Sequence, residues 1–139
     1  MMIVVECYSD EYLIKSLGFP RKKIKHGKSK GNVVDKVKNG SRIIGMIDED
    51  PDSAQPSDLK NYVHKKAAGK IKLLVRNNDN HKRIIQISPR LEEWLLHRAK
   101  MNQISLKDFN LPADPNKFHS LGRLERKKNF QSFIKRLVE

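Results

Sequence analysis

A short apolar segment that ends in a cluster of acids is the first candidate for chemistry in this chain. Residues 43–47 are apolar, Asp48, Glu49 and Asp50 follow them directly, and Asp52 comes two positions later. The length and β-branched content of the segment predict a buried strand of the kind found in parallel sheets. On an extended backbone, Asp48 and Asp50 would point the same way. Two such carboxylates suit a hard divalent cation, and the competing interpretation is ordinary turn chemistry.

A second segment near the N-terminus has the same pattern. Residues 2–5 are apolar and predict another buried strand, and Glu6 ends it. Glu is disfavoured in strands and in turns, so turn chemistry explains Glu6 less well than it explains the aspartates. Neighbouring strands lie about 4.8 Å apart. If the two strands are parallel, Glu6, Asp48 and Asp50 lie at one edge of the sheet and repel one another unless they share a cation.

The composition predicts one soluble domain with a polyanionic partner. The chain has 139 residues, of which 32% are charged, and a formal net charge of +13. So large a positive charge favours nucleic acid as the partner, although solvated lysines alone would also account for it. Cys7 is the only cysteine, so neither an internal disulfide nor a cysteine-based zinc site is expected. With no signal peptide and no apolar run long enough to span a membrane, we expect a cytoplasmic protein with no membrane partner.

Strand and helix patterns alternate along the chain and predict an α/β fold. The expected fold is a small, mostly parallel sheet flanked by helices on both faces, with a C-terminal helical extension. Residues 1–88 would form the α/β core, and residues 89–139 would pack on it as helices of the same single domain. Strands are expected at 2–6, 21–26, 43–47, 70–75 and 84–87, and helices at 9–17, about 33–39, 57–68, 89–99 and 121–138.

A basic loop, residues 27–32, could contact phosphate groups. Its Gly-Lys-Ser triplet does not make a phosphate-binding P-loop, because that motif requires Gly five positions earlier, where this chain has Lys22. Lysines beside the start of the next helix could still bind a phosphate backbone, and the alternative is a solvated loop. The candidate nucleic-acid-binding residues are Lys22, Lys23, Lys25, Lys28 and Lys30.

The order of these motifs resembles a known family. A strand ending in Val5-Glu6 precedes a helix ending in Leu17-Gly18, a second strand and helix follow, and the next strand ends in Asp48-Glu49-Asp50. This order resembles the Toprim domain, which topoisomerases, bacterial primases, small ribosomal-RNA maturases and OLD-type nucleases share. The resemblance covers roughly the first 80 residues.

A later segment is also similar to part of this family. Residues 89–96 look like the Pro-x-x-Glu-x-Trp-Leu-Leu segment of stand-alone, nuclease-like Toprim proteins. This similarity assigns Glu92 to the site and leaves Glu93 as a surface acid. On their own, both acids would be explained by their favourable position in the first turn of a helix. The chain departs from the family pattern at Cys7, where members usually carry Gly after the catalytic Glu.

The resemblance implies a Mg²⁺-dependent nuclease. Glu6, Asp48 and Asp50 would be the catalytic residues, with Asp48 and Asp50 binding one or two Mg²⁺ ions, or Mn²⁺ as a substitute. Asp52 and Glu92 would help to bind the second ion. Glu6 would act as a general acid or base or as a further ligand. The partner would be DNA or RNA, and a protein partner such as an ATPase is compatible with this branch of the family.

Two alternatives to a nuclease remain. The first is a non-catalytic, Toprim-like nucleic-acid-binding protein, or a subunit of a larger defence or processing complex. The second is that the acids only cap helices and that the positive charge is incidental. Topoisomerase strand passage is not expected, because the tyrosines fall within the pattern of the core, and primer synthesis is not expected either.

Overall fold

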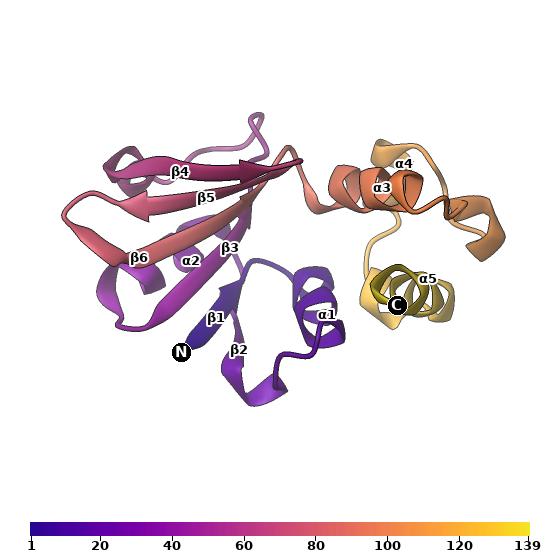
Figure 1. Cartoon of the computed structure of the whole chain (residues 1–139), viewed down its shortest axis with the longest axis horizontal. Helices are drawn as coiled ribbons and strands as arrows, with labels where there is room; N and C mark the ends of the chain where they lie inside the picture. Colours follow the sequence, from indigo (N-terminus) through magenta and orange to yellow (C-terminus); the bar gives the residue numbers. More distant parts are fainter.

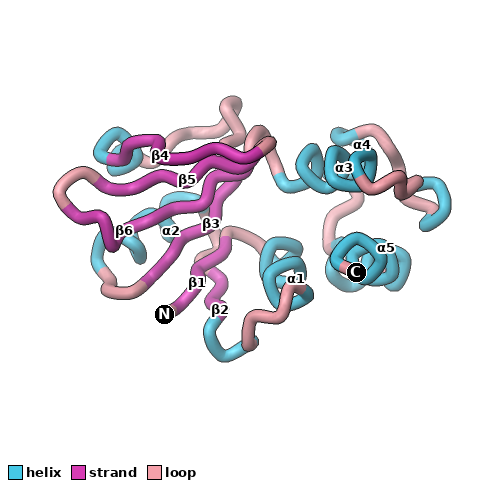
Figure 2. Tube along the Cα trace, viewed as in Figure 1, coloured by secondary structure: helices cyan, strands magenta, loops and turns pink.

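A single mixed sheet organises the chain in the computed structural model, which describes residues 1–139 (Figure 1). Its six strands lie in the order β2-β1-β3-β6-β5-β4. The strands are β1 (Met2–Val5), β2 (Ile24–His26), β3 (Ile43–Asp48), β4 (Tyr62–Ala68), β5 (Ile71–Arg76) and β6 (Asp79–Ile87). The helices are α1 (Tyr8–Ser16), α2 (Lys30–Asn39), α3 (Leu91–Met101), α4 (Pro115–Ser120) and α5 (Lys128–Val138). Figure 2 shows α3, α4 and α5 grouped beyond one end of the strands.

The sheet is α/β as expected, but it is only partly parallel. β2, β1, β3 and β6 are joined by three parallel pairings, whereas β4–β5 and β5–β6 are antiparallel. The antiparallel part follows from two tight turns, Gly69-Lys70 and Asn77-Asn78, whose residues Gly69 and Asn78 have positive φ. Such residues favour hairpins, so the chain reverses here without a crossover helix.

The predicted helix at 57–68 is wrong. Only a 3₁₀ turn, Ser57–Asn61, forms, and the chain continues into β4. Leu59, Tyr62 and Val63 fit a helical stripe as well as a strand, and pairing with β5 decides between the two. The backbone hydrogen bonds that a helix would have supplied are made across the hairpin instead.

The predicted helix at 121–138 is also too long. Gly122 and Arg123 have positive φ, a short 3₁₀ turn follows at Leu124–Arg126, and α5 begins only at Lys128. Residues 102–120, where no helix was expected, contain α4, which begins with Asp114 as its cap and Pro115 in its first turn. Both are favoured residues for starting a helix.

Helices pack against the parallel part of the sheet. Val4, Ile47 and Ile84 are buried in one cluster with the valines of α2. Ile3 and Val5 belong to a second cluster that includes residues of α1, α3 and α5. Since alternate residues of a strand face opposite sides, α1 and α2 contact opposite faces of β1. β4, at the other edge of the sheet, buries only Tyr62.

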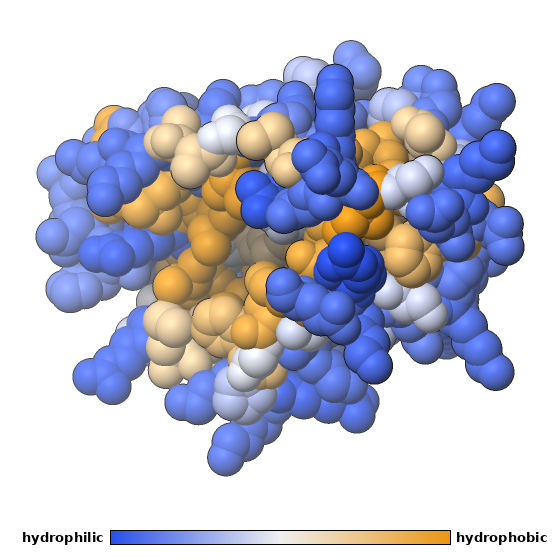
Figure 3. Space-filling model, turned by 45° about the vertical axis from the view of Figure 1, so that its right-hand side comes forward, coloured by the Kyte–Doolittle hydropathy of each residue, from blue (hydrophilic) through white to orange (hydrophobic).

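The outer part of the sheet is more open. β2 and β4 are the two edge strands, and β4 exposes His64, Lys65 and Lys66. A pocket between the turn after β4 and the helices is lined mainly by apolar residues, including Leu17, Ile71, Trp94 and Leu137. In Figure 3, apolar side chains line a hollow between the sheet and the C-terminal helices. None of the helices combines the length and the apolar character needed to cross a membrane.

Candidate metal and phosphodiester site

Parallel pairing of β1 and β3 brings Glu6 and Asp48 together. Val5, the last residue of β1, pairs with Met46 of β3, so the two acids follow at the same edge of the sheet. The backbone N–H of Asp48 donates a hydrogen bond of 3.2 Å to Oε1 of Glu6. The second carboxyl oxygen of Glu6 makes no hydrogen bond within the chain.

A third acid reaches this edge from α3. β6 lies parallel to β3, with Ile87 paired to Asp48, and α3 begins four residues after Ile87. The loop after β3 is tied to this junction, because Glu49 N–H donates to the Ile87 carbonyl and Asp50 N–H to the Pro89 carbonyl. Glu92, in the first turn of α3, is buried as a result.

Asp10 is a fourth acid of the cluster, and the sequence analysis missed it. It lies in the first turn of α1 and is only 1% exposed. Its Oδ2 accepts hydrogen bonds from the backbone N–H of Cys7 (3.3 Å) and from the Cys7 thiol (3.2 Å). A signal was present, because Asp10 falls on the same helical face as Leu13 and Ile14, the buried residues of α1. An acid within an apolar stripe requires an explanation other than helix capping alone.

Buried oxygen atoms without partners mark this acid cluster, which consists of Glu6, Asp10, Asp48 and Glu92. Oδ1 of Asp10, Oδ1 of Asp48 and Oε2 of Glu92 are all buried and accept no hydrogen bond. A buried carboxylate oxygen left unpaired is costly, so native structures rarely retain one without a functional reason. Three of them lie at one sheet edge, where protons or a bound cation would satisfy them.

The pKa values of three acids in the cluster are raised by their burial and by the charges of neighbouring acids. Burial raises the pKa of Asp48 to about 8, and the charges of Asp10, Glu6 and Glu92 add to this effect. Burial, assisted by Glu6 and Glu92, also raises the pKa of Asp10 to about 7. Burial raises the pKa of Glu6 as well, although the Asp48 amide and the Lys30 charge oppose the shift. Like charges held together in this way are relieved by protons or by a bound cation.

Two of the predicted ligands are placed differently from the other acids. Asp50 has a φ of +37°, so the backbone is not extended after Asp48, and the argument that the two acids point the same way is wrong. Asp50 still lies near enough to Glu6 for its charge to raise the pKa of that carboxyl. Asp52 is exposed. Glu49 instead pairs with Lys72 at 3.2 Å.

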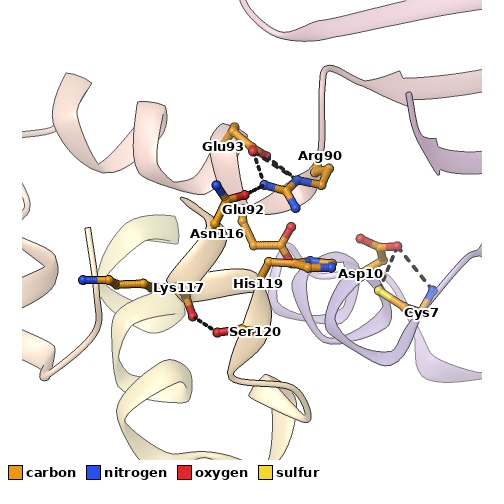
Figure 4. Close-up of polar contacts among 9 residues, drawn as sticks. All are labelled: Cys7, Asp10, Arg90, Glu92, Glu93, Asn116, Lys117, His119 and Ser120. Carbon is orange, nitrogen blue, oxygen red and sulfur yellow. Dashed lines mark hydrogen bonds and ion pairs between the residues drawn. The ribbon is translucent and has the colours of Figure 1, made fainter. Parts of the chain in front are cut away.

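Helix α4 closes one side of the acid cluster. Nδ1 of His119 lies 3.2 Å from Oε1 of Glu92, and in Figure 4 the His119 ring lies between Glu92 and Asp10. Glu93, by contrast, turns away and pairs with Arg90, which also donates to Oδ1 of Asn116. The structure thus separates the two neighbouring glutamates, with Glu92 in the acid cluster and Glu93 in a partly buried ion pair with Arg90.

The candidate phosphate-binding lysines divide into two groups. Lys22, Lys23, Lys25 and Lys28 are exposed on β2 and on the turns before and after it. Lys30 is buried, and its Nζ donates to the Glu49 carbonyl (2.8 Å), Oγ of Ser53 (2.9 Å) and Oε1 of Gln55 (3.4 Å). All of its donors are used to hold the acidic loop, so Lys30 is not available to a phosphate backbone.

The donor atoms fit a hard divalent cation in type. All four residues offer carboxylate oxygen, which Mg²⁺ and Mn²⁺ prefer, and three of these oxygens have no other partner. No group of three or more His, Cys, Asp or Glu side chains is already arranged to hold a metal ion. Ligation would therefore require these carboxylates to turn toward one point.

The acid cluster lies at a sheet edge beside the exposed lysines on and around β2. Comparisons of the chain with protein-family models, curated proteins and solved structures found no match.

Proposed function

We propose that this protein is a metal-dependent phosphodiesterase that acts on nucleic acid, with a Toprim-like site. The observation that carries the proposal is the meeting of Glu6, Asp10, Asp48 and Glu92 at one sheet edge, with three buried carboxylate oxygens unpaired. The charge of +13 and the exposed lysines around β2 supply the attraction for a phosphate backbone.

Different residues would have different roles in the proposed reaction. Asp48, Asp10 and Glu92 would hold the divalent ion, and such an ion would stabilise the negative charge that develops on phosphodiester oxygens. Glu6 is held by the Asp48 amide through one oxygen, so its other oxygen can accept or return a proton. The raised pKa of Glu6 brings that exchange closer to neutral pH. Lys22, Lys23, Lys25 and Lys28 hold the backbone without reading its sequence.

A non-catalytic nucleic-acid-binding protein is the second candidate. It is favoured by the hydrogen bonds that the acids already make within the chain: Glu6 accepts from the Asp48 amide, Asp10 from Cys7, and Glu92 contacts His119. In this case the acid cluster would be structural, and the protein would act as a subunit of a larger defence or processing assembly.

Substitution of Asp48 separates the two candidates. We expect the wild-type chain to cleave labelled DNA or RNA with Mg²⁺ or Mn²⁺ and to bind it in EDTA, more weakly at higher salt. Asp48→Ala should abolish cleavage and leave binding in EDTA nearly unchanged. Asp35→Ala, which removes an exposed acid of α2, is the matched control and should cleave normally.

Calorimetry gives an independent measure of the metal site. Titration with Mn²⁺ should show binding heat for the wild type and for Asp35→Ala, and none for Asp48→Ala. Nucleic-acid binding without cleavage or metal heat would support the second candidate. If the wild type binds neither nucleic acid nor metal, both candidates are excluded.

A further inference from the structure

An aromatic stack with one exposed ring lies beside the acid cluster. The rings of Tyr8 and His26 are 4.0 Å apart and 13° from parallel. Tyr8 is the first residue of α1, two positions after Glu6, and His26 ends β2. His26 pairs with Val5, the residue before Glu6, and Gly27 N–H donates to the Val5 carbonyl at 2.7 Å. The stack therefore lies at the same edge of the sheet as the acids.

The exposure of the stack is not explained by packing. Tyr8 is 49% exposed although its ring lies against His26, so about half of the side chain is left to solvent. Neither ring nitrogen of His26 has a hydrogen-bond partner, and both are buried. His26 thus serves mainly as a rigid backing for Tyr8. An exposed aromatic residue held in a fixed plane offers a surface for stacking another ring.

We infer that the Tyr8–His26 stack binds an unpaired nucleobase next to the phosphodiester held at the acid cluster. Aromatic side chains stack on bases that are free of a duplex, and this contact tolerates any base because each has a π-face. Lys25 and Lys28, both exposed and each within two residues of His26, can meet the neighbouring phosphates. The inference rests on the proposed function and narrows its substrate to single-stranded or locally unpaired nucleic acid.

Binding measured without catalysis tests this subsite. Fluorescence anisotropy of the full chain in EDTA would compare oligothymidylate and oligouridylate with a blunt duplex and with a strand of the same length that carries abasic sugars. Tyr8→Ala should weaken binding of the base-bearing single strands by about 5-fold to 150-fold, the usual cost of losing one stacked base. Binding of the duplex and of the abasic strand should stay the same.

Two further variants separate stacking from folding. Tyr8→Phe keeps the ring and should bind single strands almost as the wild type does. Phe19→Ala removes another exposed aromatic residue, which lies three positions after the end of α1, and it should leave binding unchanged. Thermal melting of each variant shows whether the fold is intact.

The outcomes distinguish the subsite from the proposed function. If Tyr8→Ala binds single strands as well as the wild type does, or weakens duplex and single strands equally, the subsite is excluded and the proposed function stands. The subsite is equally excluded if the wild type binds the abasic strand as tightly as the base-bearing one. If the wild type binds no nucleic acid at all, the proposed function fails and the subsite fails with it.

Discussion

At the level of single residues, the acid cluster shows how burial changes what a carboxylate can do. Asp10 and Glu92 are at most 8% exposed, and each retains one oxygen without a partner. An acid placed there only to start a helix would keep its free oxygen in water, where it costs nothing. Asp10 caps α1 with one oxygen, and its other oxygen is available to the cation that we propose.

Asp10→Asn tests that second role. The amide can still accept from the Cys7 N–H, so α1 should form normally, but the negative charge is lost. We expect the affinity for Mn²⁺ to fall by at least about 10-fold to 100-fold, which is the usual cost of losing a residue that only supports a metal ligand. In EDTA the variant should be as stable as the wild type or more stable, because one buried negative charge is removed. Thermal melting with and without Mn²⁺ measures both effects.

Asp35→Asn is the control for that measurement, since Asp35 is exposed on α2. It should show the wild-type gain in melting temperature with Mn²⁺. An equal gain for Asp10→Asn would mean that Asp10 does not contribute to ion binding.

The residues at this site were predictable to different degrees. Glu6 and Asp48 were found because each ends an apolar strand, a pattern that the sequence displays directly. The direction of the Asp50 side chain is set by its left-handed backbone conformation. Lys30 is occupied by three hydrogen bonds to the loop after β3. These bonds join segments that are distant in the chain, so local sequence patterns do not reveal them.

At the level of elements, one ion pair helps to explain why residues 57–68 form a turn and a strand. Asp58, in the 3₁₀ turn, accepts hydrogen bonds from Nη2 (2.8 Å) and Nε (3.2 Å) of Arg76, at the end of β5. It also accepts from Asn61 at 2.8 Å. These bonds fix the turn to the hairpin. The spacing of the apolar residues does not predict them.

The Asp58–Arg76 pair predicts a pH dependence of stability. The hydrogen bond from Arg76 lowers the pKa of Asp58 below its ordinary value of 3.8. A carboxyl that is more acidic in the folded chain stabilises the fold while it is ionised, above its unfolded pKa. This contribution is lost as the pH falls below 3.8 and through the folded pKa.

Asp58→Asn should therefore lower the melting temperature at neutral pH, and the difference from the wild type should shrink as the pH falls below 3.8. Circular dichroism melts over a pH series measure this difference. Asp35→Asn again serves as the control and should change little at any pH. A constant difference between Asp58→Asn and the wild type would show that the effect is not ionic.

At the level of the whole molecule, one hydrophobic cluster joins both ends of the chain. Ile3 and Val5 of β1 share this cluster with Phe118, Phe130, Phe133 and Ile134 from the C-terminal helices. The aromatic rings of Phe118, Phe130 and Phe133 contact one another at centroid distances of 6.1–6.4 Å. The C-terminal helices thus share the core of the sheet.

Phe130→Ala tests whether the chain unfolds as one unit. Phe130 is fully buried, so we expect a loss of about 3–5 kcal/mol in the free energy of unfolding. Urea unfolding should give coincident transitions by Trp94 fluorescence and by far-UV circular dichroism. Phe19→Ala, at an exposed position, should cost far less. Two separate transitions would mean that the C-terminal helices form an independent unit.

The two edges of the sheet have a consequence for self-association. β2 is only three residues long, but β4 offers seven residues with no neighbouring strand on their outer side. Lys65 and Lys66 place two positive charges on that strand. Repulsion between two such strands opposes their edge-to-edge pairing in two copies of the chain. A bound polyanion would cancel this repulsion, so the same ligand that the basic surface attracts would also allow two copies to align their β4 strands.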